Sequence, residues 1–145
     1  MSKVEAFLTA NEEQEIVDAI LDVEKNTSGE IRVHIEAITP STPLERAKEV
    51  FHLLKMDNTK QQNGVLIYVA LDKKEFVIYG DKGINAVVDS NFWNSTRDKI
   101  ATQFKSSNFK QGLINGINEA GKVLSKYFPY THGDSNELDN SISKN

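Results

Sequence analysis

The chain has 145 residues, a length that favours a single domain. Its 21 acidic and 17 basic residues give a formal net charge of −4, and it has no dense basic cluster of the kind that nucleic-acid binders carry. The absence of cysteine excludes disulfides and thiolate metal sites, and the three histidines lie too far apart for a zinc motif. No apolar run is long enough to span a membrane, and the first residues do not resemble a signal peptide. We therefore expect a cytoplasmic monomer with no membrane or nucleic-acid partner.

The first predicted elements are a helix and a strand. Thr9 and Glu12 have the spacing of a capping box, and apolar residues follow at helical intervals up to Val23. Residues 30–38 then alternate in polarity, with Ile31, Val33 and Ile35 on one face and Arg32, His34 and Glu36 on the other. This alternation predicts a half-buried strand at a sheet edge, on which His34 is exposed.

The middle of the chain predicts a second helix and two more strands. Thr42 precedes Pro43 in a second capping pattern, and a helix is expected over about 43–56. Residues 64–71 are apolar at both parities, which indicates a central strand covered on both faces. After a polar turn, residues 76–80 are expected to form a third strand, antiparallel to the second.

The last part of the chain predicts two helices and a tail. One helix is expected to begin near Asp89 and to carry Phe92 and Trp93, and the other carries the apolar residues of 113–124. Residues 131–145 have almost no apolar side chains and are expected to be a disordered polar tail behind a folded domain of residues 1–130. The order of elements predicts an α/β/α sandwich, in which a parallel β-α-β unit and an antiparallel hairpin strand form a small mixed sheet with helices on both faces.

This topology brings polar residues together at one end of the sheet. The starts of the first two strands and the end of the third lie at the same end, so Glu30, Asn63 and Asp81 are expected to share one rim. Asn85 and Asp89 follow closely in sequence. Carboxylate, amide and backbone oxygens are the ligands that Ca²⁺ and Mg²⁺ accept. These five residues are therefore our candidate site for a divalent cation, Ca²⁺ or Mg²⁺.

Structural interpretations of the same residues stay open. Asp89 is in a position typical of a helix N-cap, and Asp81 lies in a glycine-containing turn in which aspartate is common. Ligands of open α/β sheets usually bind at the other rim, where Thr39 and Asp72 are expected. We favour the acidic rim because several oxygen ligands converge there.

Several segments resemble the TPM-domain family, namely SGEIRVHIE (28–36), NGVLIYVA (63–70) and GDKGIN (80–85). The likeness covers about residues 5–130 and is greatest to a short soluble bacterial branch. The resemblance implies an α/β/α sandwich, cation binding at an acidic cluster and, in some plant members, an acid phosphatase activity. Family members often carry paired aspartates just before the first helix, and these belong to the acidic cluster. Here the matching stretch, residues 4–8, has one carboxylate and no aspartate.

Three functions are consistent with the sequence. The first is divalent-cation binding by a cytosolic TPM-domain protein at the acidic rim. The second is a metal-dependent acid phosphatase at the same site, which only the resemblance supports and for which we assign no catalytic residue. The third is a non-catalytic module that binds a protein partner through the polar face of the first strand or through the tail.

Overall fold

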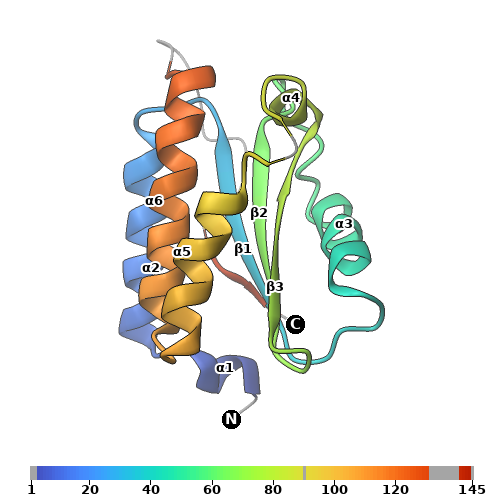
Figure 1. Cartoon of the computed structure of the whole chain (residues 1–145), viewed down its shortest axis with the longest axis vertical. Helices are drawn as coiled ribbons and strands as arrows, with labels where there is room; N and C mark the ends of the chain where they lie inside the picture. The colour runs from blue at the N-terminus through green and yellow to red at the C-terminus, as the bar shows by residue number, and fades with distance from the viewer. Residues whose placement is uncertain (1–2, 90, 131–140, 145) are drawn as a thin grey trace.

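The computed structural model describes residues 3–89, 91–130 and 141–144. The elements in chain order are α1 (Lys3–Phe7), α2 (Ala10–Glu24), β1 (Glu30–Glu36), α3 (Pro43–Leu53), β2 (Gly64–Ala70), β3 (Glu75–Gly80), α4 (Lys82–Asn85), α5 (Asn94–Lys105), α6 (Phe109–Tyr127) and β4 (Ser143–Lys144). The four strands form one mixed sheet in the order β3-β2-β1-β4. Helices α2, α5 and α6 lie on one face and α3 on the other (Figure 1). The predicted α/β/α sandwich is confirmed.

The strand register places the rim that the sequence predicted. β1 runs parallel to β2, with Glu30 opposite Gly64, and β3 runs antiparallel to β2, with Gly80 opposite Val65. The starts of β1 and β2 and the end of β3 therefore lie at one end of the sheet. The short helix α4 lies at this end, and α1 lies at the other (Figure 1).

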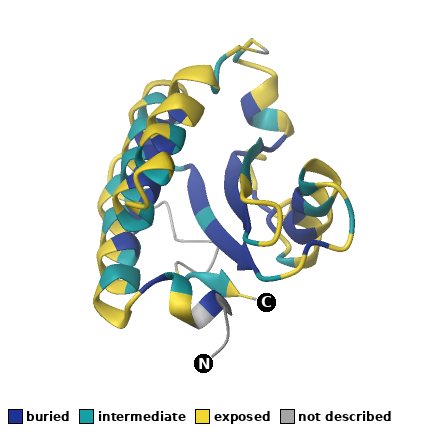
Figure 2. Cartoon of the chain, turned by 60° about the horizontal axis from the view of Figure 1, so that its bottom comes forward, coloured by how far each residue is buried: buried dark blue, intermediate teal, exposed yellow. Residues whose placement is uncertain are grey.

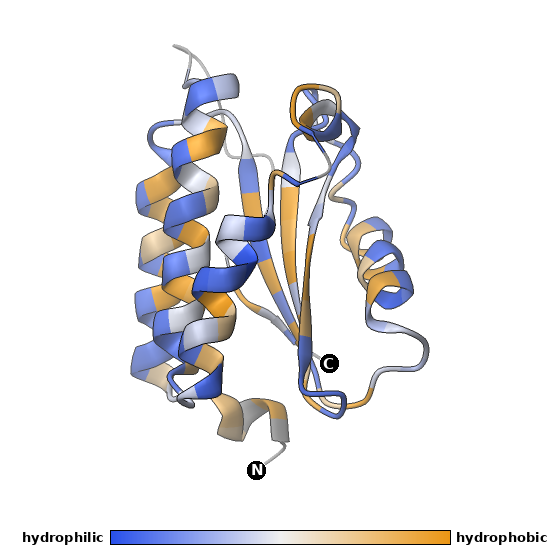
Figure 3. Cartoon of the chain, viewed as in Figure 1, coloured by the Kyte–Doolittle hydropathy of each residue, from blue (hydrophilic) through white to orange (hydrophobic). Residues whose placement is uncertain are grey.

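Two apolar cores hold the layers together. All seven residues of β2 are buried. Val65, Ile67 and Val69 pack in the core that includes α2 and α6, and the alternate residues Leu66, Tyr68 and Ala70 pack in the core of α3. Figure 2 shows β1 and β2 as largely buried strands between helices whose outer faces are exposed, and Figure 3 shows β2 as a largely apolar strand. The prediction of a central strand covered on both faces is confirmed.

The first strand differs from its prediction. Six of the seven residues of β1 are buried, and His34 is only 2% exposed, so β1 is not half-buried and His34 is not on the surface. Its second edge is also partly covered, because His34 and Ile35 pair with Ser143 and Lys144 of β4. The alternation of β1 in sequence reflects polarity rather than exposure, since its polar side chains have buried partners that are distant in sequence.

The C-terminal residues also depart from the prediction. Residues 131–140 and 145 of the expected disordered tail lie outside the described residues, but Ser143 and Lys144 form β4, parallel to β1. The ammonium group of Lys144 pairs with the carboxylate of Glu13 on α2. Within the described ranges, no helix is both long and apolar enough to cross a membrane.

The helix starts follow local hydrogen bonds. Thr9 and Glu12 form the predicted reciprocal capping box of α2. The helix predicted from about Asp89 begins later, at Asn94, because Asp89 forms a turn in which its side chain accepts a hydrogen bond from Asn91 N at 2.9 Å. Phe92 and Trp93 therefore precede α5 rather than belonging to it, and Trp93 packs against the core.

Candidate functional site

The rim at the start of β2 is built from two adjacent segments. The chain after β3 continues beside the loop before β2, because Asp81 N donates to Gly64 O at 3.0 Å and Gly83 N donates to Gln62 O at 2.8 Å. Residues 57–63 and 81–85 therefore lie against each other. This pairing holds Asp81 and Asn63 at one end of the sheet, as the topology predicted.

Three side-chain oxygens at this rim are buried without a hydrogen-bond partner among the described residues. Asp81 is 7% exposed; its Oδ1 accepts from Lys82 N at 2.7 Å, but its Oδ2 has no donor. Asn63 is 1% exposed; its Nδ2 donates to Ser28 Oγ at 3.2 Å, but its Oδ1 has no donor. The Oγ1 of Thr59 is buried in the same way. Buried acceptors of this kind call for an explanation, such as a bound water or ion.

The other predicted ligands are placed less favourably. Asn85 is exposed, and its Nδ2 donates to Gly80 O at 3.2 Å. Asp89 is exposed and caps its own turn, so its side chain has the structural role that the sequence left open. Glu30 lies on β1, on the other side of β2 from Asp81, which is a separation of two strand spacings, or about 10 Å. The rim therefore holds the backbone segments of Asp81 and Asn63 side by side, but it does not bring Glu30 beside them.

Glu30 has a carboxyl neighbour on α2. Glu24 Oε2 accepts a hydrogen bond from Ile31 N at 3.0 Å, at the start of β1. The pKa of the Glu24 carboxyl is raised to about 8; burial is the main cause, the Ile31 hydrogen bond opposes it, and the nearby Glu30 carboxylate adds to it. A proton on Glu24 at neutral pH relieves the repulsion between the two groups. This pair was not predicted, because the two residues belong to different elements.

No group of three or more His, Cys, Asp or Glu side chains that could hold a metal ion occurs in the part of the chain that the structure describes. A cation at the Asp81 rim would therefore depend on amide, hydroxyl and backbone oxygens and on water, with few carboxylates. Calcium accepts such mixed oxygen ligands, and a low number of charged ligands goes with weak affinity. The three unpartnered oxygens fit an oxygen-seeking cation in their chemistry.

The opposite rim holds a buried polar network whose members are paired. Glu36 accepts hydrogen bonds from Arg46 and from the Tyr68 hydroxyl. Asp72 accepts from both N and Oγ1 of Thr39, and the backbone hydrogen bond lowers the pKa of its carboxyl. The carboxylates here already have donors, so this network holds α3 and two strand ends together. Sequence reasoning missed it because the partners of Glu36 lie 10 and 32 residues away.

The segment that matches the paired aspartates of the family lies far from Asp81. Residues 3–7 form α1, in which Val4 is buried in the main core together with Leu8. Figure 1 shows α1 and α4 at opposite ends of the sheet. Aspartates at these positions would therefore be too distant to share a site with Asp81, so the Asp81 rim must be judged on its own residues.

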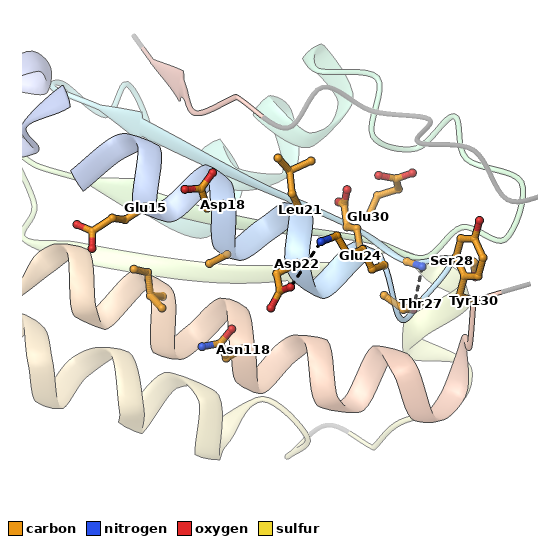
Figure 4. A pocket seen from close by; sticks show the side chains of 14 residues that line it. Glu15, Asp18, Leu21, Asp22, Glu24, Thr27, Ser28, Glu30, Asn118 and Tyr130 are labelled. Atoms are coloured by element: carbon orange, nitrogen blue, oxygen red, sulfur yellow. Dashed lines mark hydrogen bonds and ion pairs between the residues drawn. The ribbon is translucent and has the colours of Figure 1, made fainter. Parts of the chain in front are cut away.

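A groove lies beside the start of β1 and has a volume of about 1150 Å³. Figure 4 shows acidic side chains from α2 along it, with Glu24 and Glu30 close together at its centre. Tyr130 and the loop of Thr27 and Ser28 close one end. The sequence offered one signal for it, the carboxylates at positions 15, 18 and 22, whose spacing puts them on one helix face.

Comparisons with known proteins agree with this architecture. The family profile of the TPM domain matches residues 2–123. The NMR structure of the BA42 protein from the psychrophilic bacterium Bizionia argentinensis is 63% identical, with all of both chains aligned and a TM-score of 0.92. The solution NMR structure of the N-terminal domain of a protein from P. gingivalis is 19% identical, covers 87% of this chain and 83% of its own and has a TM-score of 0.69, a likeness of fold. A search of curated proteins finds no match.

Proposed function

This chain belongs to the TPM-domain family, and we propose that it binds a divalent cation, Ca²⁺ or Mg²⁺, at the rim formed by Asp81 and Asn63. The supporting observation is the set of buried oxygens without donors: Asp81 Oδ2, Asn63 Oδ1 and Thr59 Oγ1. A buried carboxylate oxygen without a partner is costly, and a cation would offset that cost directly. In this proposal Asp81 supplies the negative charge and the other two supply neutral oxygens.

The remaining predicted ligands take secondary places in the proposal. Asn85 and Asp89 follow Asp81 on the same segment, and either side chain reaches the ion only after a local change of its present hydrogen bonds. Glu30 is the weakest of the set, because it lies across β2 and beside Glu24. With so few charged ligands we expect a dissociation constant of about 10⁻⁴ to 10⁻³ M.

The role of the ion would be to join two segments. The loop of residues 57–63 and the start of α4 meet through backbone hydrogen bonds such as Gly83 N to Gln62 O. An ion shared by Asn63 and Asp81 would neutralise the carboxylate and tie these segments together. The proposal therefore predicts that calcium orders this rim and leaves the helix layer on the other face of the sheet unchanged.

Calcium titration followed by amide NMR tests the proposal. We expect chemical-shift changes concentrated in residues 59–64 and 80–86, saturating in the millimolar range. The Asp81→Asn variant keeps the side-chain oxygen that caps Lys82 N but removes the charge, so its shifts should be largely lost. Asp98→Asn, an exposed position on α5, is the matched control and should titrate like the wild type. Shifts spread evenly over the chain, or equal in Asp81→Asn, would reject the site.

Phosphatase activity at the same rim rests on the family alone, and no contact among the described residues favours it. Phosphoryl transfer needs metals or cationic side chains that stabilise the developing charge. The same variant distinguishes the two functions. If hydrolysis of p-nitrophenyl phosphate were found and persisted in Asp81→Asn, the Asp81 rim would be excluded from that reaction.

A further inference from the structure

The groove beside β1 combines an apolar floor with acidic walls. Ala19, Leu21 and Ile114 contribute apolar surface, and Leu21 is 41% exposed. Asp18 and Asp22 of α2 stand along it (Figure 4). Glu15, Glu24 and Glu30 also line the groove, and Lys25, the one basic residue among its described lining, pairs with Asp22 at 3.9 Å across an exposed contact that a bound lysine could replace. A surface of this composition complements a ligand that is both basic and apolar.

The edge of β1 along this groove has no strand beside it among the described residues. The described part of β4 pairs only with His34 and Ile35, at the far end of β1. Nearer the groove, Ile31 N points away from β2 and donates a hydrogen bond to Oε2 of the Glu24 carboxyl group at 3.0 Å instead of to a strand. An added strand would take over Ile31 N from the Glu24 side chain, so an extended peptide could pair with this part of β1 once Glu24 moves aside.

The β4 segment shows how such a peptide would bind. Its backbone runs parallel to β1, and Ile142 just before it packs against the main core. The Lys144 ammonium pairs with Glu13 on α2. One short extended segment thus combines backbone pairing with β1, an apolar contact and a lysine directed to an α2 carboxylate.

The spacing of the α2 carboxylates continues this pattern. Asp18 and Asp22 are four residues apart on a helix, or about 6 Å along its axis. Alternate residues of a strand are about 6.6 Å apart. A strand between α2 and β1 would therefore bring a lysine at every second position near successive α2 carboxylates, while the intervening residues would lie on the opposite face of the strand.

We propose that this groove binds an extended segment of a partner protein with a lysine at every second position, and that the segment adds as a further strand to the half of the β1 edge nearest the groove. The charge of the groove and the arrangement of β4 indicate this occupant. Asp81 and Asn63 do not line this groove, and the variants in its test leave both in place, so the test does not depend on cation binding.

A blocked hexapeptide, Lys-Val-Lys-Val-Lys-Val, is a suitable probe in low-salt buffer. Titration followed by amide NMR should shift residues 18–24 and 29–33, and affinity should fall as salt rises. The double variant Asp18→Asn/Asp22→Asn should weaken binding at least fivefold. The matched double variant Glu45→Gln/Asp98→Asn, at exposed positions on α3 and α5, should bind like the wild type. Equal affinity in both double variants, or shifts elsewhere in the chain, would overturn the proposal.

Two further peptides separate strand addition from simple charge attraction. Lys-Pro-Lys-Pro-Lys-Pro carries the same charge but lacks half of the backbone donors, so it should bind at least fivefold more weakly. Glu-Val-Glu-Val-Glu-Val can pair but has the wrong charge and should not bind. Equal binding of the proline peptide would overturn strand addition, and binding of the acidic peptide would overturn the charge match.

Discussion

The guanidinium group of Arg46 on α3 donates hydrogen bonds to both carboxylate oxygens of Glu36 at the end of β1. Arg46 Nη2 donates to Glu36 Oε1 at 2.7 Å, and its Nε donates to Oε2 at 3.0 Å. The side chains of Arg46 and Glu36 are only 13% and 5% exposed, and the Tyr68 hydroxyl donates to the same carboxylate. This pair joins the α3 layer to the sheet at the rim opposite Asp81.

We predict that Arg46→Met destabilises the protein by about 3 kcal/mol, because it leaves a buried carboxylate without its compensating charge. Urea unfolding at pH 7 measures the change. Glu49→Gln is the control, since it removes the other, more exposed partner of Arg46 and should cost less than about 1 kcal/mol. Adding Glu36→Gln to Arg46→Met should recover part of the loss. A loss in Arg46→Met as small as in the control would contradict this account.

His34 predicts a dependence of stability on pH. Burial lowers the pKa of His34, an effect that the Glu36 carboxylate opposes and that Arg46 and Arg32 reinforce. Its Nδ1 lies 2.9 Å from Ser143 Oγ, and its ring stacks on Tyr68. Because the folded state favours the neutral ring, the stability that His34 contributes is present above its unfolded pKa, about 6.5, and is lost as the pH falls through the lower folded value.

The variant His34→Gln tests this dependence. Glutamine stays neutral, so the free energy of unfolding should decrease less between pH 7 and pH 5 than in the wild type. His52→Gln controls for the loss of a histidine at an 80% exposed position, where the ring pairs with Asp57, and should change the slope less than His34→Gln does. Denaturant unfolding at several pH values measures the slopes. The same slope in His34→Gln and the wild type would show that His34 does not titrate on unfolding in this range.

How well the fold could be predicted depended on how local the signals are. The run of β2 is apolar at both parities, and it is buried on both faces as expected. The alternation of β1 gave a wrong prediction of its exposure. Glu36 and His34 are buried with partners on α3, β2 and β4, and no local sequence pattern predicts these partners. β4 is only two residues long, and the residues Ser143 and Lys144 carry no strand signal.

For the candidate site, strand topology predicted which residues lie at the same end of the sheet, but it did not predict their side-chain contacts. Strand directions alone placed Asp81 and Asn63 at one rim, and the structure brings their segments together. Side-chain hydrogen bonds decide the rest: Asp89 caps a turn and Glu30 has Glu24 as its neighbour. Such choices depend on contacts between elements, which the spacing of residues along the chain does not encode.

The Asp81→Asn variant should show how the Asp81 charge affects the free energy of unfolding without a cation and, separately, how it contributes to calcium binding. Without added cation we expect the variant to be as stable as the wild type or slightly more so, because it removes the charge from a buried carboxylate oxygen that lacks a donor. Saturation at about 100 times the dissociation constant should stabilise the wild type by about 2.7 kcal/mol, a rise in Tm of about 5–10 °C. The variant should gain little. Thermal unfolding with calcium measures both, and an equal gain in the two proteins would place the ion elsewhere.

Gly116 allows α6 to approach α5 closely. A Cβ at this position would lie 2.5 Å from Ile100 Cδ1 and 2.7 Å from its Cγ1. We predict that Gly116→Ala destabilises the protein by about 1–3 kcal/mol, because the helices must separate or Ile100 must leave its preferred rotamer. Gln111→Ala, at an exposed position on the same helix, should change stability by less than about 0.5 kcal/mol.

A double-mutant cycle with Ile100→Ala assigns that cost to the contact. Ile100→Ala alone should cost about 2–4 kcal/mol because it opens a cavity in the core. In the double variant the methyl group added by Gly116→Ala occupies part of that cavity, so the combined loss should be smaller than the sum of the single losses by about 1 kcal/mol or more. Strictly additive losses in urea unfolding would mean that the effect of Gly116→Ala arises within α6 and not from its packing against α5.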